Sequence, residues 1–236
     1  MKSIGYLITV YNEVKTVKKS IDDVLKIKYP KKKIIIIDNG SNDGSAEIIK
    51  KYKDPLIKKV LRKKNIGFGK SIEKGINSLD TDYIYIQYSD LEYDHKRSID
   101  MLNYAIANNL DVVLGSRLTT SIMKNKNIYE ILKFKPSYLA TIICTFLINK
   151  FYNKKFTDII GGKLYKRKTI KRIPINCYTH GFDFEFISRI LKKKLKVGEI
   201  SIKYKPRQNS SEKKIKPYHI INALYEIFKV KFFDKR

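Results

Sequence analysis

The sequence contains few of the residues that form covalent or metal cross-links. Its 236 residues include two cysteines, Cys144 and Cys177, and three histidines at positions 95, 180 and 219. Two cysteines exclude a disulfide scaffold and a cysteine-rich zinc module, and the histidines are too widely spaced for a metal-binding motif. A chain of this length buries enough surface to form a hydrophobic core without such cross-links, and its length suggests one domain, or one domain with a substantial appendage.

Long hydrophobic runs are also absent. The most apolar stretch, residues 138–148, is shorter than the roughly 18 residues that a membrane-spanning helix needs. The first ten residues contain a short apolar run and then polar Tyr11-Asn12-Glu13, which predicts a buried strand and not a signal peptide. We therefore expect a cytoplasmic protein, either soluble or peripheral at the cytoplasmic face of a membrane.

Acidic residues are scarce relative to basic ones. The chain has 50 Lys and Arg against 23 Asp and Glu, a formal net charge of +27. Residues 1–118 carry 22 basic and 15 acidic side chains (+7), whereas residues 119–236 carry 28 and 8 (+20). The excess in the second half suggests an anionic partner, such as anionic lipid, a phosphorylated substrate or nucleic acid. General enrichment in Lys is the simpler alternative explanation for the overall charge.

The first half alternates between strand and helix patterns. Apolar β-branched runs predict strands at 4–10, 34–37, 60–61, 83–87 and 112–114, with helices at about 14–27, 45–52 and 70–78 between them. This alternation predicts an α/β fold with a mostly parallel sheet flanked by helices. Ligands of such sheets bind beyond the carboxyl ends of the strands, where polar residues follow each predicted strand here.

The polar clusters favour a nucleotide ligand of a particular kind. A phosphate-binding P-loop motif is absent, and Gly67-x-Gly69 lacks the third glycine of a dinucleotide-binding motif. Carboxylates at the strand ends suit the ribose and base of a nucleotide and a divalent cation that bridges its diphosphate. A nucleic-acid-binding protein is the alternative from another class, but acidic residues at this edge would repel nucleic acid.

Taken together and in order, the clusters resemble a family 2 glycosyltransferase of the GT-A fold. They are most similar to the polyprenol-phosphate sugar synthase branch, which includes dolichol-phosphate mannose synthase. The matching segments, which span nearly the whole chain, are residues 9–13, 37–45, 65–69, 89–94, 115–117, 158 with 161–162, 181–185, 204–207 and 213–215.

The resemblance implies a role for each matching residue. Tyr11, Glu13, Asp38, Asn39 and Gly67 would bind the nucleotide-sugar donor, together with Asp90. Further roles are implied for the metal and the phosphates: Asp90 and Glu92 would hold Mg²⁺ or Mn²⁺, and Arg117, Arg207 and Lys213 would surround the acceptor phosphate and the donor diphosphate.

One position departs from the family pattern. The D-x-D metal motif appears here as Tyr88-Ser89-Asp90, so the first carboxylate is absent. Mg²⁺ is often held by one or two protein carboxylates together with substrate phosphates, and Asp90 and Glu92 could be these two carboxylates. We expect weakened or altered metal binding, and a non-catalytic relative that binds nucleotide-sugar without turnover is an alternative.

The residue types also bear on the acceptor. The resemblance implies inverting, in-line transfer to a polyprenyl phosphate. Such a phosphate is largely dianionic at neutral pH and needs positive charge more than a general base. The alternative is a family 2 transferase acting on a saccharide or other glycan acceptor, which would need a base such as Asp158 or Asp183.

Two amphipathic segments complete the prediction. Residues 136–152 carry Leu139, Ile142, Ile143, Phe146 and Leu147 at helical spacing, followed by lysines. Residues 218–236 predict a second basic and aromatic helix. We expect a glycosyltransferase domain at 1–217, with a donor half at 1–118 and an acceptor half at 119–217. The helix at 136–152 lies either in the core or in the membrane interface.

Overall fold

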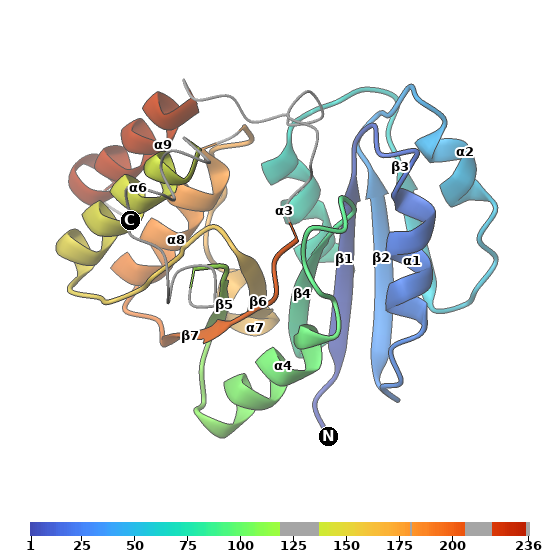
Figure 1. The fold of residues 1–236 in the computed structure, drawn as a ribbon, viewed down its shortest axis with the longest axis horizontal. Coiled ribbons are helices and arrows are strands. Elements are labelled where there is room, and N and C mark those ends of the chain that lie inside the picture. The colour runs from blue at the N-terminus through green and yellow to red at the C-terminus, as the bar shows by residue number, and fades with distance from the viewer. Residues whose placement is uncertain (119–136, 180, 206–218, 235–236) are drawn as a thin grey trace.

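The computed structural model describes residues 1–118, 137–179, 181–205 and 219–234, and within these it forms a seven-stranded sheet. The strand order is β3-β2-β1-β4-β6-β5-β7. Helices lie on both sides of the sheet, as Figure 1 shows. The predicted α/β fold with a mostly parallel, helix-flanked sheet is therefore confirmed.

The first half forms the parallel part of the sheet. Its strands are β1 (Ile4–Val10), β2 (Lys32–Asp38), β3 (Ile57–Leu61) and β4 (Tyr83–Tyr88). β1 pairs with β2 on one side and β4 on the other, and both pairings are parallel. Every residue of β1 is buried, as expected of a strand covered on both faces.

The second half departs from strict alternation. β5 (Val112–Ser116) does not pair with β4, because β6 (Gly162–Lys166) lies between them and is antiparallel to both. β7 (Val197–Ser201) then pairs in parallel with β5 at the edge. Because β6 reverses direction between β4 and β5, those two strands still end at the same edge of the sheet.

Side chains from the two faces of the sheet form two separate cores. One contains Tyr6, Ile8 and Ile34, covered by α1 (Val17–Leu25), α2 (Ser45–Lys50) and α4 (Arg97–Ala107). The other contains Leu7 and Ile35, covered by α3 (Phe68–Ser78), α7 (Arg167–Ile170) and α8 (Phe182–Lys192). Alternate residues of each strand thus point to opposite helical layers.

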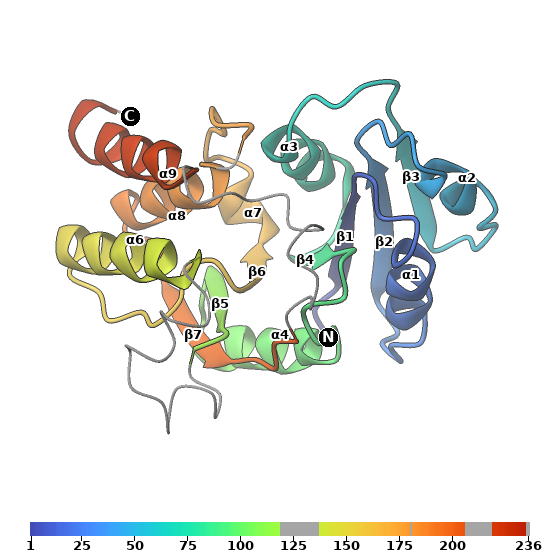
Figure 2. The ribbon, with the colours of Figure 1, turned by 45° about the horizontal axis from the view of Figure 1, so that its top comes forward.

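Three helical segments of the second half lie next to one another. α6 (Ser137–Tyr152), α8 and α9 (His219–Phe228) run side by side in Figure 2, and a π-helical turn, η2 (Lys229–Phe233), continues α9. Phe151 of α6 contacts the rings of Phe228 and Phe232 at centroid distances of 5.4 and 5.6 Å. None of the helices in the described part of the chain is long and apolar enough to cross a membrane.

Candidate active site

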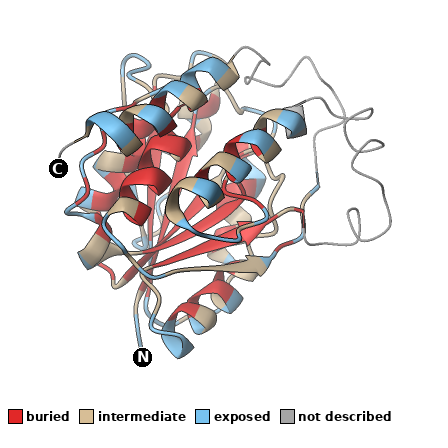
Figure 3. Ribbon diagram, turned by 90° about the vertical axis from the view of Figure 1, so that its left-hand side faces the viewer, coloured by how far each residue is buried: buried red, intermediate tan, exposed pale blue. Residues whose placement is uncertain are grey.

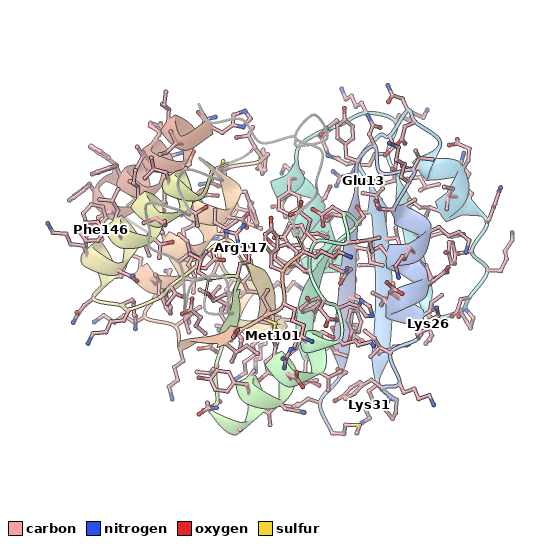
Figure 4. All side chains as sticks on the ribbon, in the orientation of Figure 1. Glu13, Lys26, Lys31, Met101, Arg117 and Phe146 are labelled. Atoms are coloured by element: carbon pink, nitrogen blue, oxygen red, sulfur yellow. The ribbon has the colours of Figure 1, made fainter. Side chains whose placement is uncertain are left out.

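Loops from four strands meet at one edge of the sheet. Val10, at the end of β1, is in register with Asp38 at the end of β2, and Thr9 is in register with Tyr88 at the end of β4. Arg117 follows β5, whose carboxyl end lies at the same edge. In Figure 4, Arg117 lies near the middle of the molecule and Glu13 near the top of the part that β1, β2 and α1 form. Most of the predicted site residues are therefore brought to a single edge.

The loops after β1 and β2 are locked together by hydrogen bonds. The backbone N–H of Asn12 donates to Ser41 Oγ at 2.9 Å, and that of Glu13 donates to Ser45 Oγ at 2.9 Å. Asn12 adopts a positive φ of 51°, which the small polar side chain of Asn tolerates. These bonds fix the loop that carries Tyr11 and Glu13, and Tyr11 is exposed.

Asp38 is a buried carboxylate at the end of β2. Its Oδ2 accepts hydrogen bonds from the backbone N–H groups of Gly40 at 3.2 Å and Ser41 at 3.1 Å. Its Oδ1 is also buried and accepts no hydrogen bond from the described residues. Because buried polar atoms are nearly always paired, this oxygen is suited to accept a hydrogen bond from a ligand.

Asn39, directly after β2, holds the turn at residues 65–69 that contains Gly67. Asn39 Nδ2 donates to Asn65 Oδ1 at 2.6 Å, and Arg62 Nη1 donates to Asn39 Oδ1 at 3.2 Å. Gly67 has a φ of 94°, and a Cβ there would lie only 2.3 Å from the carbonyl oxygen of Tyr178. The residue at 67 must therefore be glycine because of both its conformation and the adjacent backbone.

Tyr88 stands where the family pattern has the first metal-binding carboxylate. Its ring stacks on Phe68 at a centroid distance of 5.9 Å, and its hydroxyl lies 3.4 Å from Lys163 Nζ. Burial raises the pKa of the Tyr88 hydroxyl well above its usual value, and the nearby Asp183 carboxylate raises it further, so the hydroxyl stays protonated.

Lys163 is an unexpected buried cation in the middle of the sheet. It is 1% exposed, and its ammonium group donates to the carbonyls of Ile160 at 2.9 Å and Gly161 at 3.2 Å. It also lies 3.0 Å from Asp183 Oδ1. The ammonium group is thus satisfied by the protein, and it places a positive charge next to the residue that replaces the carboxylate.

Asp90 and Glu92 follow Tyr88 in the loop after β4. The Glu92 backbone N–H donates to Asp90 Oδ1 at 3.2 Å, and Tyr204 Oη donates to Glu92 Oε2 at 2.8 Å. Leu91 between them has a φ of 60°, a strained conformation of the kind that is concentrated at functional sites. No group of three or more His, Cys, Asp or Glu suited to a metal ion occurs among the described residues. Two carboxylates remain sufficient for a cation that is also bound by substrate phosphates.

Arg117 forms a buried ion pair with Asp158. Its Nε lies 2.6 Å from Asp158 Oδ2 and its Nη2 lies 3.0 Å from Asp158 Oδ1, a bidentate arrangement. Burial acts to raise the pKa of Asp158, but the charge and hydrogen bonds of Arg117 outweigh burial and hold this pKa below its usual value. The pair orients the guanidinium group, which also lies over the ring of Tyr204.

The two aspartates considered as general bases differ in their surroundings. Asp158 is fully buried, and both of its oxygens accept hydrogen bonds from Arg117, so it is poorly placed to take a proton from an acceptor. Asp183, in the first turn of α8, has a side chain that is 19% exposed. Arg207 and Lys213 lie outside the described residues.

Lys163 was not predicted as a site residue from the sequence. The pairing of Arg117 with Asp158 and that of Glu92 with Tyr204 were not predicted either. In the sequence, Lys163 resembles an ordinary surface lysine in a short strand. Arg117 and Asp158 are 41 positions apart, so their pairing follows only from the positions of β5 and of the loop before β6.

Comparisons with known proteins agree with the fold, a GT-A-like α/β arrangement. The model of the family Glycosyl transferase family 2 matches residues 6–173. The chain therefore belongs to glycosyltransferase family 2.

Curated relatives act on different acceptors. The chain is 26% identical over 211 residues to cholesterol galactosyltransferase of Borreliella burgdorferi, covering 84% of this chain and 58% of the relative. It is 35% identical over 95 residues to poly-β-1,6-N-acetyl-D-glucosamine synthase of Staphylococcus epidermidis, covering 40% of this chain and 23% of the relative. In both cases the chain spans less than two thirds of the relative's length.

Solved structures share the fold at low identity. Glucosyl-3-phosphoglycerate synthase of Mycobacterium tuberculosis, in complex with Mn²⁺, UDP and phosphoglyceric acid, superposes with a TM-score of 0.70 at 11% identity, covering 99% of this chain and 80% of that one. A mannosyltransferase of Pyrobaculum calidifontis, in complex with GDP-mannose and Mn²⁺, has a TM-score of 0.63 at 11% identity, covering 96% and 69%.

Proposed function

We propose that this glycosyltransferase moves a sugar from a nucleotide-sugar donor to a polyprenyl phosphate at the surface of a membrane. The observation that carries the proposal is the meeting of Asp38, Asp90 and Arg117 at one sheet edge, in a molecule whose α6 and α9 expose apolar side chains. The first feature suits a nucleotide diphosphate, and the second suits a lipid-borne acceptor.

The donor would bind over the ends of β1 and β2. Asp38 offers a buried carboxylate oxygen that accepts no hydrogen bond from the described residues, suited to a donor group of the base or ribose. Tyr11 and Glu13 lie on the adjoining loop, which the serines of the β2 loop hold in place. Solved structures with similar folds contain UDP or GDP-mannose, which supports a nucleotide-sugar donor.

A divalent cation would be held by Asp90 and Glu92. Both carboxylates lie in one short loop, and Tyr204 fixes one oxygen of Glu92. Oxygen ligands in this number fit Mg²⁺ or Mn²⁺ that is also bound by a diphosphate. When bound, the cation would offset the negative charge that develops on the leaving diphosphate.

Arg117 would bind the acceptor phosphate and the donor diphosphate. Asp158 and Tyr204 hold its guanidinium group in place, so little conformational entropy is lost when an anion binds to it. A phosphate acceptor is already ionised, so positive charge is the main requirement for bringing it to the donor. Arg207 and Lys213 remain predicted contributors to the same charge.

The membrane contact is supported by the orientation of α6. Of the predicted apolar stripe, Leu139, Ile143 and Phe146 are exposed, with Phe146 at 63%, and Ile142 and Leu147 are partly exposed. Cys144 and Ile148, which lie outside this stripe, are buried. Figure 3 shows exposed surface along the outer sides of this helical layer, and Figure 4 shows Phe146 at its outer margin. An exposed apolar stripe on a helix with nearby lysines is typical of an interfacial helix.

A second candidate is transfer to a hydroxyl group of a sterol or a glycan. It is favoured by the names of the two curated relatives, a cholesterol galactosyltransferase and a poly-β-1,6-N-acetyl-D-glucosamine synthase, and by the partly exposed carboxylate of Asp183, which is paired with Lys163. A hydroxyl acceptor requires such a base, whereas a phosphate acceptor does not.

An acceptor panel separates the two. Purified protein is incubated with UDP- and GDP-linked sugars, Mn²⁺, and either a short polyprenyl phosphate, cholesterol in vesicles, or an oligosaccharide. The proposal predicts that a polyprenyl-phosphate sugar forms, and only when polyprenyl phosphate is the acceptor. This product should be lost in Arg117→Ala but not in Asp183→Asn. Transfer only to cholesterol or to the oligosaccharide, abolished by Asp183→Asn, would overturn the phosphate acceptor.

A further inference from the structure

Glu185 is a buried carboxylate that the proposed reaction does not use. It lies on α8, most of whose residues are buried, and is 0% exposed. An isolated charge in such a place is costly, so its partners must compensate for the loss of water. They belong to two different parts of the chain.

The first partner is a cation on the next turn of α8. Arg189 Nε donates to Glu185 Oε1 at 2.9 Å, and Arg189 itself is 5% exposed. The remaining acceptor capacity of Glu185 is used by a loop, because the backbone N–H of Cys177 donates to Oε2 at 2.9 Å and that of Asn176 lies 3.1 Å from both oxygens. The carboxylate thus pins residues 176–177 to α8.

The pinned loop continues directly into contact with the turn at residues 65–69. The Tyr178 carbonyl accepts the backbone N–H of Gly69 at 3.2 Å. The Lys70 ammonium group lies 4.2 Å from the centroid of the Tyr178 ring. The close approach of Gly67 to the Tyr178 carbonyl leaves no room for a side chain between the two segments. Any movement of the loop would therefore move the turn.

The turn is held from its other side by the end of β2. Asn65 Oδ1 accepts hydrogen bonds from Asn39 Nδ2 at 2.6 Å and from the backbone N–H of Gly67 at 2.8 Å. Asn39 follows Asp38, the buried carboxylate of the candidate donor site. Residues 65–69 are therefore clamped between the donor carboxylate region and the loop that Glu185 holds.

We propose that Glu185 is a positioning residue of the donor site, which acts through residues 176–178 to hold the turn at 65–69 in its nucleotide-binding position. The inference rests on the proposed function, since it assumes that the turn contacts the donor. Both oxygens of the Glu185 carboxylate accept hydrogen bonds from the backbone of residues 176–177, which the ion pair with Arg189 does not by itself require.

Nucleotide binding without acceptor tests the inference. The dissociation constants of UDP and GDP are measured calorimetrically with Mn²⁺ for the wild type, Glu185→Gln and Tyr178→Ala. Glu185→Gln keeps the size but loses the charge, and Tyr178→Ala loosens the same contact from the loop side without altering the buried pair. Because each variant removes an interaction that holds the loop or the turn in place, the charge of Glu185 in one and the ring of Tyr178 over Lys70 in the other, we expect the dissociation constant of the nucleotide to rise about tenfold in each variant.

Glu226→Gln is the matched control. Glu226 is also a buried carboxylate, on the neighbouring α9, and its hydrogen bond is with Lys229 and not with the 176–178 loop. It should lower stability in urea without changing nucleotide affinity. In steady state, Glu185→Gln should raise the KM for the donor and leave the KM for the acceptor unchanged.

The outcomes distinguish the inference from the function on which it rests. If the wild type binds neither nucleotide, the proposed function fails. If the wild type binds and Tyr178→Ala binds equally well, the positioning role is overturned even should Glu185→Gln fail to fold. An equal loss of affinity in Glu226→Gln would also overturn it, because general loosening of the helical layer would then be the cause.

Discussion

At the scale of single residues, side chains and loops of the site are held in place by ion pairs and by hydrogen bonds to carboxylates. Arg117 is oriented by Asp158, Glu92 by Tyr204, and the loop at 176–177 by Glu185. The first two pairs join segments that are 41 and 112 positions apart in the sequence. The sequence identified Arg117 and Glu92 because each lies just after a predicted strand, but it could not identify their partners, because those depend on tertiary packing.

Replacing Asp158 tests the buried pair. Asp158→Asn should reduce transfer strongly and lower the free energy of unfolding by about 3 kcal/mol, because Arg117 would lose its buried counter-ion. The matched control is Asp100→Asn, which breaks an exposed pair with Arg97 and should cost less than about 1 kcal/mol. Urea unfolding measures both, and equal losses would contradict the account.

The same pair predicts a pH dependence of stability. Because the pKa of Asp158 is lower in the folded than in the unfolded protein, its contribution is complete above the unfolded value of about 3.9 and is lost as the pH falls through the lower folded value. The difference in unfolding free energy between wild type and Asp158→Asn should therefore be constant from pH 8 to about 5 and shrink in more acidic solution. A difference that grows on acidification would contradict this sign.

Tyr88→Asp restores the family pattern and tests the effect of Lys163. The ammonium group of Lys163 lies 3.4 Å from the present hydroxyl and is paired with Asp183, so its positive charge should offset part of the attraction of a carboxylate at position 88 for a metal ion. We expect the affinity for Mn²⁺, measured calorimetrically with UDP present, to change less than about threefold, or about 0.6 kcal/mol. A gain of tenfold or more would show that Lys163 has no such effect.

At the scale of elements, the strands of the first half were the easiest to predict. β1 and β2 are continuous apolar runs, and such runs are a local signal of strands buried on both faces. β6 and its insertion between β4 and β5 were not predicted, because strand order is set by contacts between distant segments. The helix at 136–152 was predicted, but only the structure shows which of its sides faces outward.

The exposed stripe of α6 predicts a membrane contact that can be removed without unfolding the protein. Phe146→Glu should lower co-sedimentation with anionic vesicles about tenfold, because a charge replaces an exposed ring that would enter the lipid interface. Ile106→Glu changes a comparably apolar, exposed position on α4 and should have no effect. Equal binding by wild type and Phe146→Glu would contradict the membrane face.

At the scale of the whole molecule, the composition limited the classes of binding partner, and the structure shows where the acidic and the exposed apolar residues lie. The net charge of +27 alone suggested nucleic acid, lipid or phosphate as partners. The family and the acidic groups at the strand ends favour a nucleotide-sugar, and the exposed apolar residues of the second half lie in the part of the sequence that carries most of the charge. The acceptor could not be predicted as far as the donor, because only a few side chains in a binding site determine which acceptor fits.

The charge predicts that membrane binding depends on salt. Binding to anionic vesicles should weaken steeply between 0.1 and 1 M NaCl, as the screening length falls from about 10 to about 3 Å. Neutral vesicles should bind weakly at every salt concentration. Equal affinity for neutral and anionic vesicles would show that the charge has no role in binding.

The most direct test of the account is the transfer of a labelled sugar from a nucleotide-sugar into polyprenyl phosphate embedded in anionic vesicles. The initial rate at which label enters the lipid phase is compared between wild type and Asp90→Asn. The account predicts label in the lipid with wild type and a loss of about a hundredfold or more with Asp90→Asn, because the diphosphate would lose its metal-binding carboxylate. Label that stays in the aqueous phase with wild type, or an undiminished rate with Asp90→Asn, would contradict it.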